Sequence, residues 1–343
     1  MNATYEPDDN EKVTDDTWIC HIMATEAVIG VVGNLLVCFV ILRVKFLHNM
    51  TNYLLVNLAV ADMLLCLQVF LFYLSASECE LIAFAPVDVG LRELFCRLIR
   101  SRFLAWAMCY ASAYNLCVVT LERYIAIVHP LHYARKLTTA RMITLIVMIW
   151  MISFVLPVPF LFTIEPSDDV NEICSEANHP HPAFPILVSI FSFFFGYLLP
   201  LTLMSLAYYK MQVTLKRQAK ALNLQHARAA AYDLLIARQN LVSMLKTVLG
   251  ALIILWTLSY LATLPCINLT EKGLFLFCGS KGYRYTKVVC NLLFNFNSVI
   301  NPIIYEFKYK KFRQGLKVAF CSCSKKHGGN RVDVEMDIYV CRQ

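Results

Sequence analysis

Charged side chains are scarce in this sequence. Lys, Arg, Asp and Glu make up 16% of the 343 residues, whereas hydrophobic residues make up 58%, and the mean hydropathy is +0.56. In an ordinary soluble domain about a quarter of the residues are charged, because the surface must be solvated by water. The composition therefore excludes a typical soluble protein and indicates a membrane protein.

Period-2 alternation of apolar and polar residues, the pattern of a transmembrane barrel strand, is also missing. The apolar residues instead form seven continuous runs of roughly 20 residues, the length that a helix needs to cross a hydrocarbon layer of ~30 Å. Inside lipid the backbone must satisfy its own hydrogen bonds, so the runs are predicted to be helices. The sequence predicts an all-α integral membrane protein with spans near residues 19–43, 53–76, 95–121, 140–163, 184–209, 241–266 and 287–305.

The distribution of basic residues predicts the orientation of these spans. With the N-terminus outside, 22 of the 31 Lys and Arg residues fall in the inner segments, as the positive-inside rule requires. Residues 1–17 are acidic and polar and lack the pattern of a cleavable signal peptide, so we expect the first span to act as its own anchor. The net charge of +7 places basic residues beside anionic lipid headgroups, which makes nucleic acid the poorer partner.

Three motifs place polar groups where a membrane makes them costly. The sequence Glu-Arg-Tyr (residues 122–124) directly follows the third run. An arginine at this position must extend its side chain to the membrane surface or pair with an acid. Asp62 lies in the middle of the second run, and NPIIY (residues 301–305) ends the seventh. In their order along the chain, these motifs resemble those of rhodopsin-like (class A) G-protein-coupled receptors.

This resemblance implies a seven-transmembrane-helix bundle with a short amphipathic eighth helix. It divides the chain into an outer tail (1–17), a receptor domain (18–306), an amphipathic helix (307–320) and a cytoplasmic tail (321–343). It also implies a plasma-membrane receptor, not an enzyme, that binds an extracellular ligand and activates heterotrimeric G proteins. The residues implied for the activation switch and for coupling are Glu122, Arg123, Tyr124, Tyr208, Asn301, Pro302 and Tyr305.

A sodium ion is the one metal that the resemblance implies. In the family the carboxylate at the position of Asp62 holds this ion together with polar groups of the third and seventh helices, which are Ser112 and Asn297 in this chain, with Asn301 as a further candidate. Oxygen ligands suit such a hard cation. The alternative is a structural aspartate that is protonated or bonded to water.

Six of the fourteen cysteines lie at or beyond the predicted outer face, where disulfides persist. The resemblance implies a bridge from Cys96, at the head of the third span, to Cys174 in the second outer loop. Cys266 and Cys278 flank the third outer loop and are candidates for a second bridge, with Cys20 as a competing partner.

Two further kinds of modification follow from the predicted topology. Asn2 and Asn268 lie in glycosylation sequons outside the membrane. Cys321 and Cys323 follow the basic amphipathic segment and are candidates for palmitoylation.

The sequence also departs from the family at two places. Trp256 occupies the position of the helix-six tryptophan, but the following residues, Thr257-Leu258-Ser259, lack the proline of the family's motif. Twenty-seven positions separate Cys96 from Arg123, two more than is usual in the family, which predicts a shifted or bulged outer end of the third helix.

The choice of ligand is narrowed by what the spans lack. No acid lies between residues 97 and 121 to pair with an amine, and Asn295 stands where opsins carry the lysine that binds retinal, so neither an amine nor retinal is expected. Aromatic residues recur along the outer half of the third span, as in a pocket wall or in plain helix packing. The residues that we predict for the ligand pocket are Arg102, Trp106, Tyr110 and Trp256.

Charge in the outer loops leaves two interpretations open. The acids of the second outer loop could attract a cationic peptide, whereas the arginines at the head of the third span could bind an anionic small molecule or lipid; alternatively, these charges neutralise one another. We favour a peptide ligand. The rival function, an ion pump or transporter with seven helices, would need a relay of membrane carboxylates, and Asp62 is nearly alone.

Overall fold

The computed structural model describes residues 17–74, 88–131, 133, 138–168, 172–178, 181, 183–224, 229–263, 281–320, 323–325 and 339–341. Within this part of the chain, seven segments are long and apolar enough to cross a membrane, so the prediction of an all-α membrane protein is confirmed. The helices are α2 (Thr17–Arg43), η1 (Lys45–Leu47), α3 (Met50–Leu74), α4 (Val89–Phe95), η3 (Cys96–Arg100), α5 (Phe103–Val128), α7 (Thr139–Val155), η4 (Val158–Phe162), α8 (Phe184–Ser192), η5 (Phe193–Leu198), α9 (Leu199–Leu224), α10 (Ala229–Thr263), α12 (Lys281–Lys308) and α13 (Lys310–Phe320). The strands are β1 (Ile164–Pro166), β2 (Cys174–Glu176), β3 (Cys323–Lys325) and β4 (Tyr339–Cys341).

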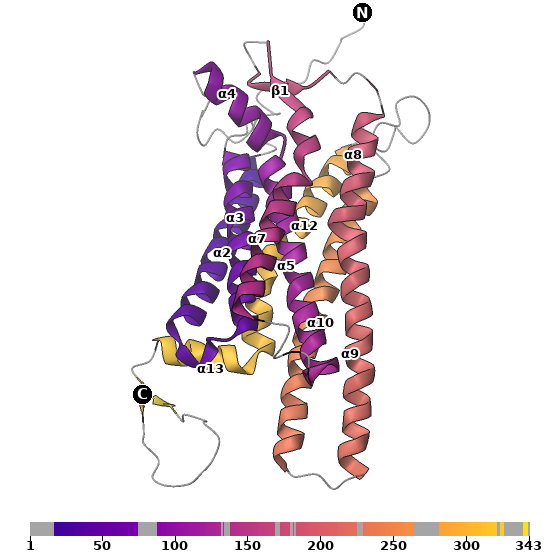
Figure 1. Cartoon of the computed structure of the whole chain (residues 1–343). Coiled ribbons are helices and arrows are strands. Elements are labelled where there is room, and N and C mark those ends of the chain that lie inside the picture. Colours follow the sequence, from indigo (N-terminus) through magenta and orange to yellow (C-terminus); the bar gives the residue numbers. More distant parts are fainter. Residues whose placement is uncertain are drawn as a thin grey trace, which may run out of the picture.

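The spans lie side by side in one bundle, with β1 at one end and α13 lying across the other (Figure 1). At the α13 end, α9 and α10 project beyond their neighbours.

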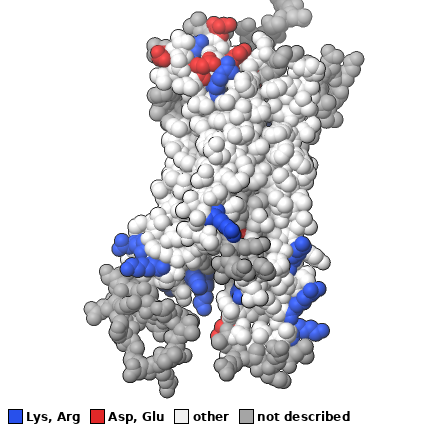
Figure 2. All heavy atoms as spheres, in the orientation of Figure 1, with Lys and Arg blue, Asp and Glu red and all other residues white. Residues whose placement is uncertain are grey.

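Large apolar side chains cover the outside of the bundle as well as its centre. On α7, Ile143, Val147, Met151 and Val155 are each more than half exposed, which would be unfavourable in water and is ordinary in lipid. Figure 2 shows a broad uncharged band between the acid-bearing end near β1 and a basic end near α13. The basic end is therefore the cytoplasmic one under the positive-inside rule.

Two glycines allow the close contacts that fix the helices around this bundle. A Cβ atom at Gly30 in α2 would lie 2.3 Å from Sγ of Cys66 in α3, and one at Gly315 in α13 would lie 2.5 Å from a methyl carbon of Leu47. Larger residues at these positions would push apart α2 and α3, or α13 and the first inner turn.

The outer end of the third span is irregular, as its two extra residues predicted. The helical chain from α4 passes through a π-helical turn, η3, and then breaks before α5 begins at Phe103. At the break Arg102 has φ of 61°, the single positive φ among the described non-glycine residues. The π-helical turn and the break at Arg102 together change the direction of the chain before α5 begins.

Candidate ligand cavity and signalling switch

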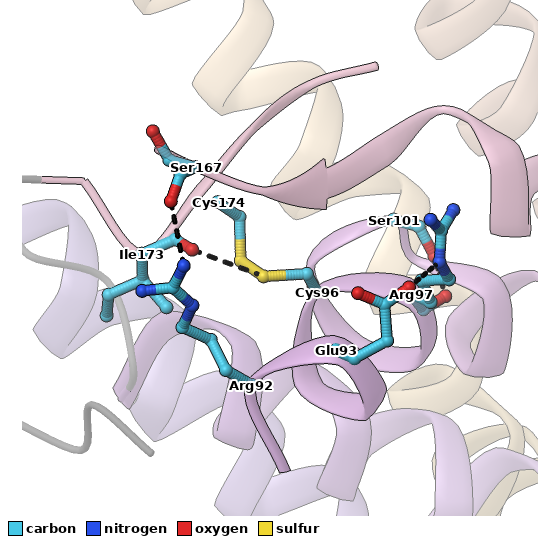
Figure 3. The surroundings of a disulfide bond; sticks show 8 residues. All are labelled: Arg92, Glu93, Cys96, Arg97, Ser101, Ser167, Ile173 and Cys174. Atoms are coloured by element: carbon cyan, nitrogen blue, oxygen red, sulfur yellow. Dashed lines mark hydrogen bonds and ion pairs between the residues drawn. A yellow bond between two sulfur atoms is a disulfide. The ribbon is translucent and has the colours of Figure 1, made fainter. Parts of the chain in front are cut away.

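The outer opening of the bundle is covered by a hairpin held by a disulfide. Strands β1 and β2 pair antiparallel, and Cys174 in β2 is bonded to Cys96 in η3 with a Cα–Cα distance of 5.7 Å. Figure 3 shows this bridge between the strand and the helical turn. The predicted Cys96–Cys174 pair is confirmed.

Two of the four arginines at the head of the third span, Arg92 and Arg97, donate hydrogen bonds to the chain on either side of strand β1. A guanidinium nitrogen of Arg92 donates to the carbonyl of Ser167 at 2.8 Å, and Arg97 pairs with Glu93 and donates to the carbonyl of Leu161 at 3.0 Å. Figure 3 shows these side chains on either side of the bridge. Mutual neutralisation of loop charges thus accounts for Arg97, whereas Arg100 and Arg102 lie over the ring of Phe72 at 4.8 and 4.6 Å.

A cavity lies between α3, α5 and α12, at the outer end of α5. Arg102 and Trp106 line it, as predicted for the ligand pocket, whereas its lining does not include Tyr110 or Trp256. Residues that line it and that the sequence did not single out are Leu65, Gln68, Val69, Phe72, Tyr73, Ala105, Cys109, Asn291, Phe294 and Asn295.

Tyr110 and Trp256 lie next to the cavity wall instead. The ring of Trp256 stacks on that of Phe294 with 4.7 Å between the ring centroids. Phe294 lines the cavity, so Trp256 lies directly behind its wall. Tyr110 is fully buried and faces Gly196 in the π-helical segment η5, where a Cβ would come within 3.0 Å of its ring. The π-helical segment η5 leaves room for Tyr110. Of the aromatic residues along the outer half of the third span, Trp106 therefore lines the cavity, whereas Tyr110 belongs to the core.

The carboxylate of Asp62 accepts three hydrogen bonds in the middle of the bundle. Ser112 and Ser298 donate to one oxygen at 2.7 and 2.8 Å, and the amide of Asn301 donates to the other at 2.7 Å. Ser298, which the sequence did not single out, is one of these donors, and it is the neighbour of the predicted sodium ligand Asn297. The carbonyl oxygens of Asn297 and Asn301 are buried without a partner, and such oxygens suit a hard cation.

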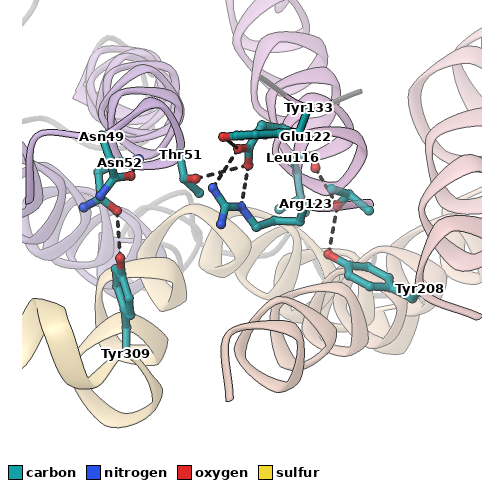
Figure 4. Close-up of polar contacts among 10 residues, drawn as sticks. Asn49, Thr51, Asn52, Leu116, Glu122, Arg123, Tyr133, Tyr208 and Tyr309 are labelled. Carbon is teal, nitrogen blue, oxygen red and sulfur yellow. Dashed lines mark hydrogen bonds and ion pairs between the residues drawn. The ribbon is translucent and has the colours of Figure 1, made fainter. Parts of the chain in front are cut away.

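At the cytoplasmic end, Arg123 is bound to Glu122. Two nitrogens of the guanidinium donate to the two carboxylate oxygens, one of them at 2.7 Å. Thr51 from α3 and Tyr133 donate to the same carboxylate at 3.1 and 2.6 Å, as Figure 4 shows. Glu122, 2% exposed, therefore has its charge balanced and its oxygens satisfied.

Two of the three tyrosines of the predicted switch, Tyr208 and Tyr305, contact residues other than Arg123. Tyr208 on α9 shares a hydrogen bond of 2.8 Å with the hydroxyl of Thr120, one turn above Arg123 (Figure 4). Tyr305 is 1% exposed and its ring lies 6.3 Å from that of Phe312 in α13. Pro302 lies inside α12, and the switch roles of all these residues stay predictions.

Sequence reasoning missed two tyrosines that tie the cytoplasmic turns to the bundle. Burial and the hydrogen bond to Glu122 raise the pKa of Tyr133. Burial likewise raises the pKa of Tyr309, which donates to Asn52 at 3.0 Å. The second contact spans 257 residues, and the first joins Glu122 of α5 to a residue 11 positions further on, beyond the end of that helix, so no pattern within one helix could have indicated them.

Glu26 was missed as well, although a signal was present. It is an ionisable residue inside the first apolar run, which marks a functional candidate in a membrane. The side chain is 9% exposed, and neither carboxylate oxygen has a hydrogen-bond partner. It lies against Leu65, Cys66, Val69 and Asn295, and Leu65, Val69 and Asn295 also line the cavity above.

Several predicted modification sites lie outside the described residues. These are Asn2, Asn268, Cys266, Cys278 and Cys321. Cys323 begins β3, and Cys20 is disulfide-bonded. The second disulfide, the two glycans and the palmitoylation therefore stay predictions.

The bundle thus combines an outer cavity, a buried aspartate and an arginine that is paired with the preceding glutamate. The family model "7 transmembrane receptor (rhodopsin family)" matches residues 33–305. The chain belongs to this family. It is accordingly a receptor and not an enzyme or a transporter.

Three relatives illustrate the range of the family. The chain is 29% identical to the somatostatin receptor type 4 of Rattus norvegicus, over 99% of this chain and 85% of that receptor. It is 29% identical to the neuromedin-U receptor 2 of Mus musculus, over 89% and 75%, and 29% identical to the histamine H2 receptor of Homo sapiens, over 88% and 78%. At about 29% identity, the relatives include receptors named after peptides and one named after an amine.

Proposed function

We propose that this receptor binds an extracellular peptide, one acidic group of which pairs with Arg102. The observation that carries the proposal is the break before α5, which places Arg102 on the wall of the outer cavity. A guanidinium binds a carboxylate through two parallel hydrogen bonds. A side-chain or C-terminal carboxylate of the peptide fits this role.

The aromatic walls and the outer acids support a peptide over a small anion. Trp106 and Phe294 offer flat apolar surface for a side chain of the ligand. Outside the cavity, Asp168, Glu172 and Glu176 are exposed on and near the hairpin, where they attract basic residues and accelerate association. A small anion would be repelled by the same acids.

Signalling follows from release of the Glu122–Arg123 pair. An agonist that binds better to a conformer with α9 and α10 parted from α5 increases the population of that conformer. Arg123 then becomes available to the G protein, and Tyr208 leaves Thr120 to face it. Arg123 forms its ion pair with Glu122 and not with an acid at the inner end of α10. Activation therefore requires the Glu122–Arg123 pair to dissociate.

Sodium is proposed as a modulator of this change. The ion would be held by the Asp62 carboxylate and the hydroxyls of Ser112 and Ser298. The unpartnered carbonyl oxygens of Asn297 and Asn301 would complete an oxygen-rich site, and the bound ion would favour the conformer in which these groups stay together.

The experiment is a screen of a peptide library for guanine-nucleotide exchange in receptor-containing membranes, followed by matched variants. Arg102→Gln should lower the potency of an agonist about tenfold or more, since a charge-assisted hydrogen bond is lost. Arg100→Gln is the control, because Arg100 also lies over Phe72 but does not line the cavity. Equal losses in both variants would contradict the assignment of Arg102.

A second arm separates a peptide from an anionic small molecule or lipid. Glu172→Gln should slow the association of a peptide agonist and weaken its dependence on salt. If Glu172→Gln instead accelerates association, the agonist is an anion and the peptide proposal is wrong.

A further inference from the structure

A second, larger hollow lies at the cytoplasmic half of the bundle, between α5 and α7. Its volume is about 390 Å³, within the range of ligand-binding pockets. It is lined by Val118, Leu121, Glu122, Ile125, Arg141, Thr144 and Leu145. Leu121 and Leu145 are exposed, so the hollow opens sideways into the band that the membrane covers.

Two charged residues, Glu122 and Arg141, line this hollow. Glu122 is saturated by Arg123, Thr51 and Tyr133, so it contributes little net negative charge. Arg141 is exposed in the first turn of α7, on the same helical face as Thr144 and Leu145 because these lie three and four residues further on. The hollow therefore combines an apolar wall with a cation at its cytoplasmic end.

We infer that this hollow binds an anionic phospholipid of the inner leaflet. One acyl chain lies against Val118, Leu121, Ile125 and Leu145, and the phosphate pairs with Arg141. A guanidinium matches the geometry of a phosphate, and Arg141 lies in the first turn of α7, at the start of that span.

The chemistry of the hollow favours this occupant over the others. A peptide inserted from the lipid would bring backbone groups without hydrogen-bond partners. A sterol would fill the apolar wall but would supply no anion to Arg141. The inference concerns the lipid side of the bundle and does not depend on the peptide cavity, although Glu122 of the proposed switch also lines the hollow.

The test uses the full chain in nanodiscs of phosphatidylcholine with one tenth phosphatidylglycerol. The bound fraction of each lipid is measured by native mass spectrometry after release from the disc. The wild type should retain phosphatidylglycerol about fivefold above its share of the bilayer, the effect of one basic residue near an anionic lipid. A phosphatidylglycerol with a photoreactive group in its acyl chain should crosslink to residues 118–125 and 141–145.

Two variants and a control decide the outcome. Arg141→Gln should abolish the enrichment, and Leu145→Trp, which keeps the charge but fills the hollow, should reduce both enrichment and crosslinking. Arg217→Gln removes an exposed inner charge of α9 that does not line the hollow and should leave the enrichment intact.

Other results would overturn the inference. Equal losses in Arg141→Gln and Arg217→Gln would mean a general attraction to the basic surface. Crosslinks outside α5 and α7, enrichment unchanged by Arg141→Gln, or displacement of the lipid by added cholesterol at equal concentration would mean that the hollow is not a phospholipid site.

Discussion

Glu26 places an acid inside the bundle with neither carboxylate oxygen hydrogen-bonded. A buried polar group without a partner costs about 1–3 kcal/mol of stability, and an acid of this kind is often better replaced by an apolar residue. Its neighbours in α3 are apolar or weakly polar. The side chain is thus held at a cost to stability, and it borders the ligand cavity.

Replacement of Glu26 by leucine should raise the thermal midpoint of the detergent-solubilised receptor. The expected gain is about 1–3 kcal/mol, because the unpartnered carboxyl is removed from an apolar site. Glu26→Gln is the matched variant and should gain less, since its amide is still without partners. A fall in the midpoint of Glu26→Leu would show that the carboxyl has a partner in the working receptor.

The structure adds Ser298 to the neighbours of Asp62 that are expected to influence the effect of sodium on agonist affinity. Asp62→Asn should abolish the reduction of agonist affinity by sodium, since the ion is proposed to favour the inactive packing. Ser298→Ala should weaken that reduction as well, because Ser298 donates directly to the carboxylate. Binding is measured in sodium and in potassium at equal ionic strength, and an unchanged sodium effect in Asp62→Asn would remove this residue from the site.

Among the elements, the outer end of α5 depends most on long-range contacts. The π-helical turn η3 absorbs the additional residues, the break at Arg102 redirects the chain, and the disulfide from Cys96 joins it to β2. The bond closes a separation of 78 residues, for which the chain-entropy model gives about 4 kcal/mol. The hairpin, the mouth of the cavity and the start of α5 therefore form one unit.

Breaking this bridge should act once, whichever cysteine is changed. Cys96→Ser and Cys174→Ser should each lower surface expression or agonist binding, and the double variant should be little worse than either single one. Such non-additivity is the sign of one shared bond. Cys290→Ser, which changes a free cysteine of α12, is the control; additive losses would mean that the two cysteines act separately.

At the scale of the whole molecule, the outer cavity and Arg123 lie at opposite ends of α5. A signal must therefore travel as a change in how the helices pack, and the polar centre at Asp62, which joins α3, α5 and α12, lies between the two sites. The released Arg123 is the proposed point of contact with the G protein.

Arg123→Ala should abolish agonist-stimulated nucleotide exchange while the receptor still folds and reaches the surface. The reason is that Arg123 is partly exposed and pairs with Glu122 at the inner end rather than packing in the core. Surface labelling and agonist binding serve as controls for folding. Normal exchange by this variant would remove Arg123 from the proposed mechanism.

The seven spans, the family and the outer bridge could all be predicted from the sequence. Apolar runs of span length leave the backbone one solution in lipid, and motifs such as ERY and NPIIY stand at recognisable positions along those runs. Even the irregular start of α5 was foreseeable, because two additional residues in a helix must be accommodated somewhere.

Which side chains meet was decided by the tertiary structure. Consecutive residues of a helix point about 100° apart, so the rotation of α12 selects Ser298 over Asn297 as the partner of Asp62. The bulge in η5 likewise gives Tyr110 a place against Gly196 instead of in the cavity. The hydrogen bond of Tyr133 to Glu122 and the hollow between α5 and α7 arise only when the chain folds back on itself after α5, because spacing along one helix carries no information about the distance to another.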